Sequence, residues 1–304
     1  MREKFVDSIG RAVNLVWMRR PVDTRIPSEV EGEVLAVYKE IHPDGDARFV
    51  PRAFQWVEDC FTGRYDGYQP IDARYHDFEH TLQGTLCMAR LLRGRHRANA
   101  QPRIGERLFD LGLLAILFHD TGYLKQKGDE EGTGAKYTLT HVRRSADFAH
   151  EFLRDKGFSE TELLAVQNMI RCTGVSGELP TIPFQSEEEK LMGFALATGD
   201  LLGQMAARDY IEKLPVLYQE FAEAVAYSKE PDCRLARFRC AEDLIRKTPS
   251  FFEDIVRSRL ELEFGGQYKF LNDPYPNGPN PYLDRVVKNL DRIETGNKPG
   301  HAAS

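Results

Sequence analysis

The chain has 304 residues, 41% of them hydrophobic and 29% charged, with a net charge of −6 at pH 7. These values are ordinary for a globular protein, and the length allows one large domain or two small ones around a substantial core. The acidic balance provides no generic nucleic-acid-binding surface, and no apolar run reaches the roughly 18 residues that a membrane-spanning helix needs.

The first fifty residues predict an N-terminal helical extension that carries no metal motif. Apolar residues recur at helical spacing from Phe5 to Trp17, and a second helix is expected from Ser28. The N-terminus mixes charges into its apolar positions and lacks the pattern of a secretory signal. The five cysteines are scattered without C-x-x-C spacing, which indicates reduced thiols. We therefore expect a cytoplasmic protein that binds neither membrane nor nucleic acid, while a homodimer stays open.

The next helices lead to the first group of chemically active residues. A short helix is expected over residues 51–63, followed by a loop up to Arg74. Asp77 stands in the position of an N-cap, which places His80 in the first turn of the following helix and His76 just outside it. The two histidines are therefore predicted to be near neighbours with different orientations, which suits two different roles.

The most informative stretch is the apolar run from Leu108 to Phe118, which predicts a helix buried on nearly all sides. It ends at His119-Asp120, and Thr121-Gly122 then stops the helix. A carboxylate there lies against the negative end of the helix dipole and out of water, so both effects oppose its charge. A bound cation would reverse this penalty, so His119 and Asp120 are predicted to be metal ligands.

The rest of the chain also predicts helices. The polar loop at residues 124–140 is either a mobile lid or a plain surface excursion. The helix after it turns His141 inward, and a helix over residues 186–206 carries Asp200 among apolar residues, where an acid is rarely unpaired. Two or three amphipathic helices are expected over residues 208–263, then a last helix capped by Asn280. No period-2 strand is seen, so the predicted fold is all-α, with a disordered tail at residues 295–304.

Three segments, taken together, indicate a family. Residues 75–80 read YHDFEH, residues 119–120 read HD, and Asp200 follows far downstream. This order resembles the HD superfamily of metal-dependent phosphohydrolases, and YHDFEHT is similar to a segment of its cyclic-nucleotide phosphodiesterase branch. The resemblance covers roughly residues 70–205. It implies an HD-type helical bundle, assigned here to residues 51–294 with extra C-terminal helices. It also implies one or two divalent ions (Mn, Fe, Zn or Mg), held by His80, His119, Asp120 and Asp200.

The resemblance also implies further roles. A metal-bound water would be the nucleophile, His76 the proton donor to the leaving oxygen, and Asp120 a catalytic residue as well as a ligand. His141 would bind a second metal or its water. Candidates for substrate binding are Tyr75, Lys125, Thr173 and Gln267.

The chain departs from the narrower families at two places. The stretch at residues 169–174 lacks the further histidine of members with a firmly bound second metal, and its Gly174 stands where phosphodiesterases have Asp. Asp77 stands where they usually have Asn. These departures leave specificity for a cyclic nucleotide open.

The predicted function is hydrolysis of a small phosphate mono- or diester, with a nucleotide among the candidates. One alternative is a mixed-valence di-iron oxygenase on the same ligand set, which needs the histidine that is missing near Thr173. Another is a non-enzymatic helical signalling module of the same ancestry. Such modules lose ligands, whereas this chain keeps all four.

Overall fold

The computed structural model describes residues 22–174, 179–228 and 233–296. Within these ranges the chain forms ten α-helices and no strand, apart from one isolated antiparallel bridge between Tyr68 and Gln126. The all-α prediction is confirmed. The α-helices are α2 (Pro27–Ile41), α3 (Phe49–Phe61), α4 (Phe78–Arg97), α5 (Glu106–Phe118), α6 (His141–Arg154), α7 (Glu160–Arg171), α8 (Glu187–Met205), α9 (Tyr210–Tyr227), α10 (Ala241–Phe251) and α11 (Pro281–Glu294).

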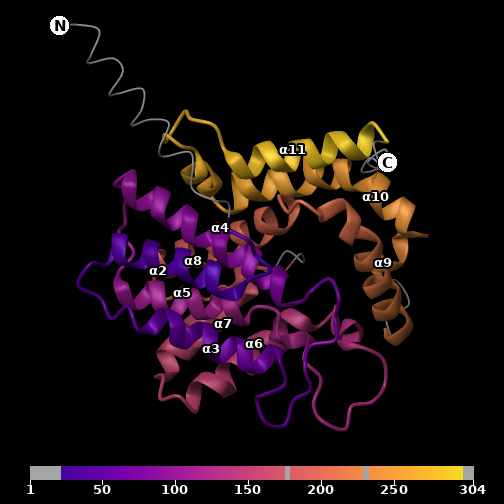
Figure 1. The fold of residues 1–304 in the computed structure, drawn as a ribbon, viewed down its shortest axis with the longest axis horizontal. Coiled ribbons are helices and arrows are strands. Elements are labelled where there is room, and N and C mark those ends of the chain that lie inside the picture. The colour runs from indigo at the N-terminus through magenta and orange to yellow at the C-terminus, as the bar shows by residue number, and fades with distance from the viewer. Residues whose placement is uncertain (1–21, 175–178, 229–232, 297–304) are drawn as a thin grey trace, which may run out of the picture.

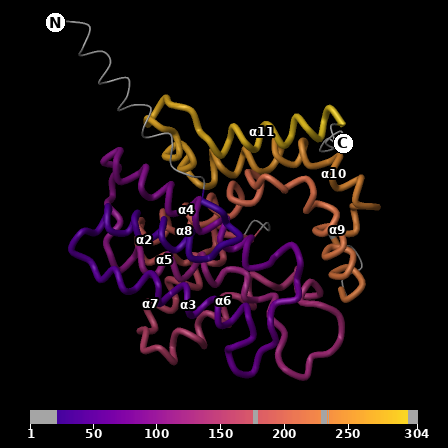
Figure 2. The backbone as a smooth tube through the Cα atoms, viewed as in Figure 1, coloured from indigo at the N-terminus to yellow at the C-terminus, as the bar shows by residue number. Residues whose placement is uncertain are grey.

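Helix α5 is the centre of the core, as its apolar sequence predicts. Every residue from Phe109 to Phe118 is buried, and the helix packs against α3, α4, α7 and α8. Helices α2 to α8 form the larger group of elements, and α9, α10 and α11 lie together along one side of it (Figures 1 and 2). The α-helical conformation ends at Phe118, and a 3-10 turn over Thr121–Tyr123 follows. The helix stop predicted at Thr121-Gly122 is therefore observed.

The described part of the predicted N-terminal extension shares this core. In α2, Val30, Val34 and Val37 are fully buried, and the helix packs on α3 and α4. The predicted helix from Phe5 to Trp17 lies outside the described residues, as does most of the predicted disordered tail, residues 297–304. The division of the chain at residue 50 stays a prediction.

Helices α4 and α8 lie antiparallel and unusually close, because glycines line their contact. A Cβ atom on Gly203 would lie 2.6 Å from the backbone oxygen of Gln83, and one on Gly199 would lie 2.9 Å from the backbone oxygen of Gly84. Real Cβ atoms are essentially never found this close to backbone atoms. Glycine is therefore required at these positions, and the close approach brings the first turn of α4 beside Asp200 in α8.

Helix ends follow the predicted caps. The Asp77 carboxylate accepts a hydrogen bond of 2.8 Å from the His80 N–H, so α4 begins where the sequence indicates. Asn280 caps α11 by accepting from two backbone N–H groups.

The C-terminal half of the chain continues as helical segments of mixed type. After α10 come two π-helical segments, η5 (Phe252–Val256) and η6 (Arg259–Glu263), and then the 3-10 segment η7 (Gln267–Leu271). Together, α9, α10, η5 and η6 account for the helices expected over residues 208–263. Among the described residues, no helix has both the length and the apolar character needed to cross a membrane.

Candidate metal centre

Four side chains from three separate helical segments meet at one buried point. His80 comes from the first turn of α4, His119 and Asp120 follow the last turn of α5, and Asp200 lies in α8. One donor atom each from His80, His119 and Asp120 lies within 4.8 Å of the other two. The Oδ1 atom of Asp200 is 3.3 Å from His80 Nε2 and 3.5 Å from His119 Nε2. The structure thus brings the four residues predicted as ligands together, and none of them is more than 8% exposed.

The distances in this group fit a chelated cation. Donor atoms about 2.1 Å from one ion are separated by about 3.0 Å at octahedral angles and by about 3.4 Å at tetrahedral angles. Asp120 Oδ2 is 3.2 Å from His80 Nε2 and 3.3 Å from His119 Nε2. His119 Nε2 and Asp120 Oδ2 are both buried without a hydrogen-bond partner, and an unpaired buried polar atom costs about 1–3 kcal/mol. A divalent metal would satisfy both atoms, so the residues fit one.

Backbone contacts prepare two of the histidines to offer a lone pair. The Nδ1 atom of His119 lies 2.7 Å from the Ile116 carbonyl oxygen, and Nδ1 of His141 lies 2.6 Å from that of Thr138. A carbonyl only accepts, so each Nδ1 carries the proton and each Nε2 is left with its lone pair. His141 Nε2 lies 3.9 Å from the Oδ1 atom of Asp120. His141 thus stands beside the Asp120 oxygen that does not face His80 and His119, and its role as a second ligand stays a prediction.

Charges within the group balance one another. Burial opposes ionisation of Asp120 and Asp200, but the imidazoles of His119 and His80 outweigh it and hold the pKa of both carboxyls well below the usual range. Burial also opposes charging of His80, yet the two carboxylates raise its pKa to about 10. In the metal-free protein the two carboxylates therefore favour the protonated form of His80. A cation that binds here must displace that proton, as at other histidine-containing sites.

His76 is held by a buried carboxylate that the sequence did not reveal. Its Nδ1 lies 2.6 Å from Oε2 of Glu220 in α9, and Oε1 of Glu220 accepts 2.7 Å from the backbone N–H of Tyr75. Burial opposes the charge on Glu220, but His76 and the backbone N–H groups lower its pKa overall. The His76 ring stacks on Tyr123, with centroids 4.4 Å apart, and its centroid is 5.3 Å from that of His80. His76 therefore lies beside the metal group in a fixed orientation.

Lys125, one of the predicted substrate-binding residues, has other partners. Its ammonium group is 2.9 Å from Asp72 Oδ2 and donates to the Gly132 carbonyl over 2.7 Å, and the residue is only 5% exposed. The predicted loop at residues 124–140 is fixed at a second point. There the Glu223 carboxylate accepts hydrogen bonds from the backbone N–H of Thr133, at 2.5 Å, and from the Thr133 hydroxyl, at 2.7 Å. The described loop is thus bound to α9 and to residues before α4.

Gln267 and Thr173 donate hydrogen bonds to backbone carbonyls of residues outside the predicted ligand set. Gln267 is 3% exposed and donates to the Leu191 carbonyl over 2.8 Å. Leu191 precedes Asp200 by nine residues, which is about 13 Å along a helix. The Thr173 hydroxyl donates to the Ile170 carbonyl at the end of α7 over 2.9 Å. Neither side chain makes a hydrogen bond to a ligand residue in the described structure.

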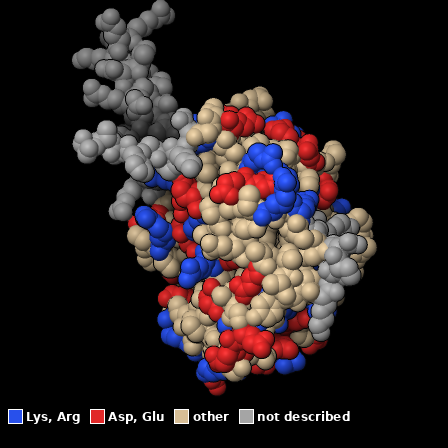
Figure 3. Space-filling model, turned by 90° about the vertical axis from the view of Figure 1, so that its right-hand side faces the viewer, with Lys and Arg blue, Asp and Glu red and all other residues tan. Residues whose placement is uncertain are grey.

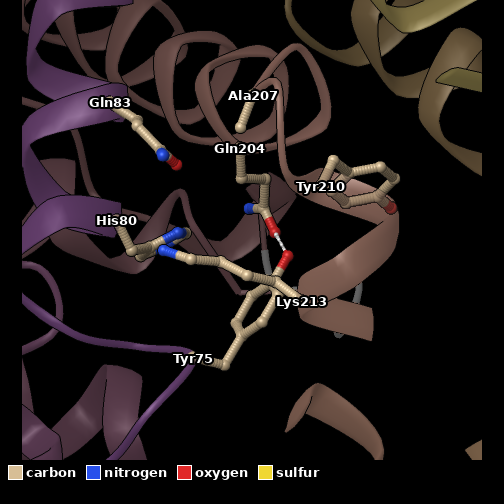
Figure 4. A pocket seen from close by; sticks show the side chains of 7 residues that line it. All are labelled: Tyr75, His80, Gln83, Gln204, Ala207, Tyr210 and Lys213. Carbon is tan, nitrogen blue, oxygen red and sulfur yellow. Dashed lines mark hydrogen bonds between the residues drawn. The ribbon is translucent and has the colours of Figure 1, made fainter. Parts of the chain in front are cut away.

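Tyr75 lines a small pocket that opens beside His80 (Figure 4). Its hydroxyl donates to the Gln204 side chain over 2.9 Å, and burial raises its pKa well above the usual value, so it stays a donor. The structure therefore joins the predicted ligands with Tyr75, His76 and His141, and adds Glu220 and Gln204. Neither the protein-family models nor the curated proteins compared with this chain gave a match.

Proposed function

We propose that the protein is a metal-dependent phosphohydrolase of the HD type that cleaves a small phosphate mono- or diester. The main support is the convergence of His80, His119 and Asp120 within chelating distance of one another, with Asp200 Oδ1 3.3 Å and 3.5 Å from the two imidazoles. These residues are also the ones that the resemblance implies as ligands. The set of two imidazoles and two carboxylates suits a borderline divalent ion such as manganese, iron or zinc.

The metal group and His76 would divide the work of hydrolysis. A divalent cation bound by these ligands would lower the pKa of a coordinated water toward neutrality and neutralise charge on the phosphoryl group. His76 is the proton donor to the leaving oxygen through Nε2, because its Nδ1 is already bound to Glu220. The Glu220 carboxylate holds the His76 ring in place through Nδ1, so a proton on Nε2 is carried at a defined position.

A small substrate fits this site better than a polymer. The four ligands are at most 8% exposed, so only a compact group such as a phosphoryl can reach them. On the face drawn in Figure 3, Lys and Arg side chains alternate with Asp and Glu instead of forming a continuous stripe along the described residues. Such a stripe is the usual surface for a nucleic-acid backbone.

We also place the protein in a reducing compartment such as the cytoplasm. Four cysteines are buried as free thiols, namely Cys60, Cys87, Cys172 and Cys233. Intracellular proteins usually keep their thiols in this state.

The test is hydrolysis of generic substrates by the protein loaded with Mn²⁺. Bis(p-nitrophenyl) phosphate, p-nitrophenyl phosphate and a panel of nucleotides would be assayed, with bound metal measured in parallel. Asp120→Ala should abolish hydrolysis together with metal binding. His76→Gln should lower kcat by about 10²- to 10⁴-fold and leave the bound Mn²⁺ unchanged.

His150 provides a matched control, because it is a histidine of α6 that pairs with Glu160 at 3.4 Å, outside the metal group. His150→Gln should keep both hydrolysis and metal. If no substrate is cleaved while Mn²⁺ is stoichiometrically bound, the proposed function is wrong.

A further inference from the structure

Gln204 touches the metal group from outside the set of ligands. It lies one helical turn after Asp200 on α8, so the two side chains are neighbours on one face of the helix. Its Nε2 atom donates to Asp200 Oδ1 at 3.2 Å and to the Asp200 carbonyl at 3.3 Å. The Oδ1 atom is the same one that faces His80 and His119. Gln204 therefore binds the same Asp200 oxygen that faces the two histidines of the metal group.

The orientation of the Gln204 amide is determined by its two partners. A carboxylate only accepts hydrogen bonds, so the NH₂ end of the amide must face Asp200. The carbonyl end then faces Tyr75, whose hydroxyl donates to it over 2.9 Å (Figure 4). If the amide flipped, its oxygen would face the Asp200 carboxylate, and two acceptors would meet. Tyr75 is 3% exposed, so water does not readily replace its bond to Gln204.

Tyr75 also connects to the proposed acid. Its backbone N–H donates to Oε1 of Glu220, and Oε2 of Glu220 binds His76 Nδ1. The side chain of Tyr75 thus fixes the group that orients Asp200, and its backbone fixes the group that orients His76. One residue therefore sets the position of the metal ligand relative to the proton donor.

We propose that Gln204 is a positioning residue that holds the Asp200 carboxylate for metal binding, and that Tyr75 fixes the Gln204 amide. This inference rests on the metal centre of the proposed function and not on its phosphohydrolase chemistry. It predicts that substitutions of Tyr75 and Gln204 have non-additive effects on metal affinity. Tyr75 acts on Asp200 only through Gln204, so its hydroxyl has no effect on metal affinity once the amide is gone.

The experiment is a titration of the metal-free full chain with Co²⁺, followed by its visible absorption bands, which report on ligand geometry. Gln204→Met keeps the size of the side chain and removes all three of its hydrogen bonds, two to Asp200 and one from Tyr75. It should raise the Co²⁺ dissociation constant by about 10- to 100-fold, as removal of a ligand-orienting partner usually does, and shift the bands. Tyr75→Phe should raise it by a smaller factor. The double variant should match Gln204→Met within about twofold.

Gln83→Met is the matched control. Gln83 lines the same pocket, but its amide donates to Glu79 at 3.4 Å and not to a ligand. The Gln83→Met variant should bind Co²⁺ with the affinity and spectrum of the wild type. The inference is overturned if Gln204→Met binds Co²⁺ with wild-type affinity and spectrum, or if Tyr75→Phe weakens binding equally with and without the Gln204 amide. A protein that shows the expected pattern and hydrolyses no phosphate ester would refute the proposed function alone.

Discussion

Gly203→Ala tests whether the close contact between α4 and α8 assembles the metal group. The added Cβ would lie 2.6 Å from the Gln83 backbone oxygen, 2.7 Å from its carbonyl carbon and 2.8 Å from the Gly84 backbone nitrogen. All three atoms belong to the backbone of a helix, so no flexible side chain can move aside. The helices must separate, or α4 must distort.

The size of the effect follows from these distances. Ordinary contact begins at 3.4 Å, so the Gln83 contact requires a shift of up to about 0.8 Å (3.4 minus 2.6). Gly203 lies three residues after Asp200 and Gln83 three residues after His80, so the shift would also separate His80 from Asp200. The distance from His80 Nε2 to Asp200 Oδ1 would grow from 3.3 Å to as much as about 4.1 Å, beyond the roughly 3.4 Å of a tetrahedral chelate. Overpacking of this kind costs about 1–3 kcal/mol of stability.

Gly32→Ala is the matched control, because Gly32 lies inside α2 and a Cβ there meets nothing within 4 Å. Both variants gain about 1 kcal/mol of helix propensity, so the difference between them isolates the overpacking cost. In urea denaturation, Gly203→Ala should be about 1–3 kcal/mol less stable than Gly32→Ala, and its Co²⁺ affinity should fall at least about tenfold. Equal stability and unchanged Co²⁺ affinity in the two variants would refute the reasoning.

Three other perturbations have defined outcomes. Burial raises the pKa of Asp110 to about 7 from 3.8, so the folded state loses stability as the pH rises from about 4 to 7. Asp110→Asn should remove this loss and raise the free energy of unfolding at pH 8 by at most about 4 kcal/mol. The gain should be smaller at pH 5, and urea denaturation at the two pH values measures it. Glu223→Ala removes both bonds to Thr133 and should speed hydrogen exchange at residues 132–134 about tenfold, whereas an unchanged rate would mean that other contacts hold the loop. Glu220→Gln should lower kcat about 10- to 100-fold without loss of bound metal, and loss of the metal instead would show that Glu220 supports the ligands and not His76.

The elements with strong local signals were predictable. The apolar run ending at Phe118, the Asp77 cap and the helical character of the chain each depend on neighbouring residues, and all three are found in the part of the chain that the structure describes. The His119-Asp120 pair stood out because a buried acid at a helix end requires a compensating charge. That requirement is visible in the sequence itself.

The remaining features depend on partners far away in the chain. Nothing near Lys125 indicates that its ammonium binds Asp72 and the Gly132 carbonyl. Glu220 is 144 residues from His76, and an acid on an amphipathic helix is most often exposed to solvent. In the sequence, the glycines of α8 look only like residues of low helix propensity. The reason for them is the nearby α4 backbone, which is brought there by tertiary packing.

Helix α9 couples two contacts at the edge of the candidate site. Glu220 and Glu223 lie less than one turn apart on it, and they bind His76 and Thr133 respectively. A rotation or displacement of this helix would withdraw both carboxylates in the same movement. His76, the proposed proton donor, and the neighbouring loop therefore cannot loosen independently. A ligand or substitution that disturbs α9 would disable the proposed chemistry and uncover the surface around it together, while α4, α5 and α8 would keep the four predicted ligands in place.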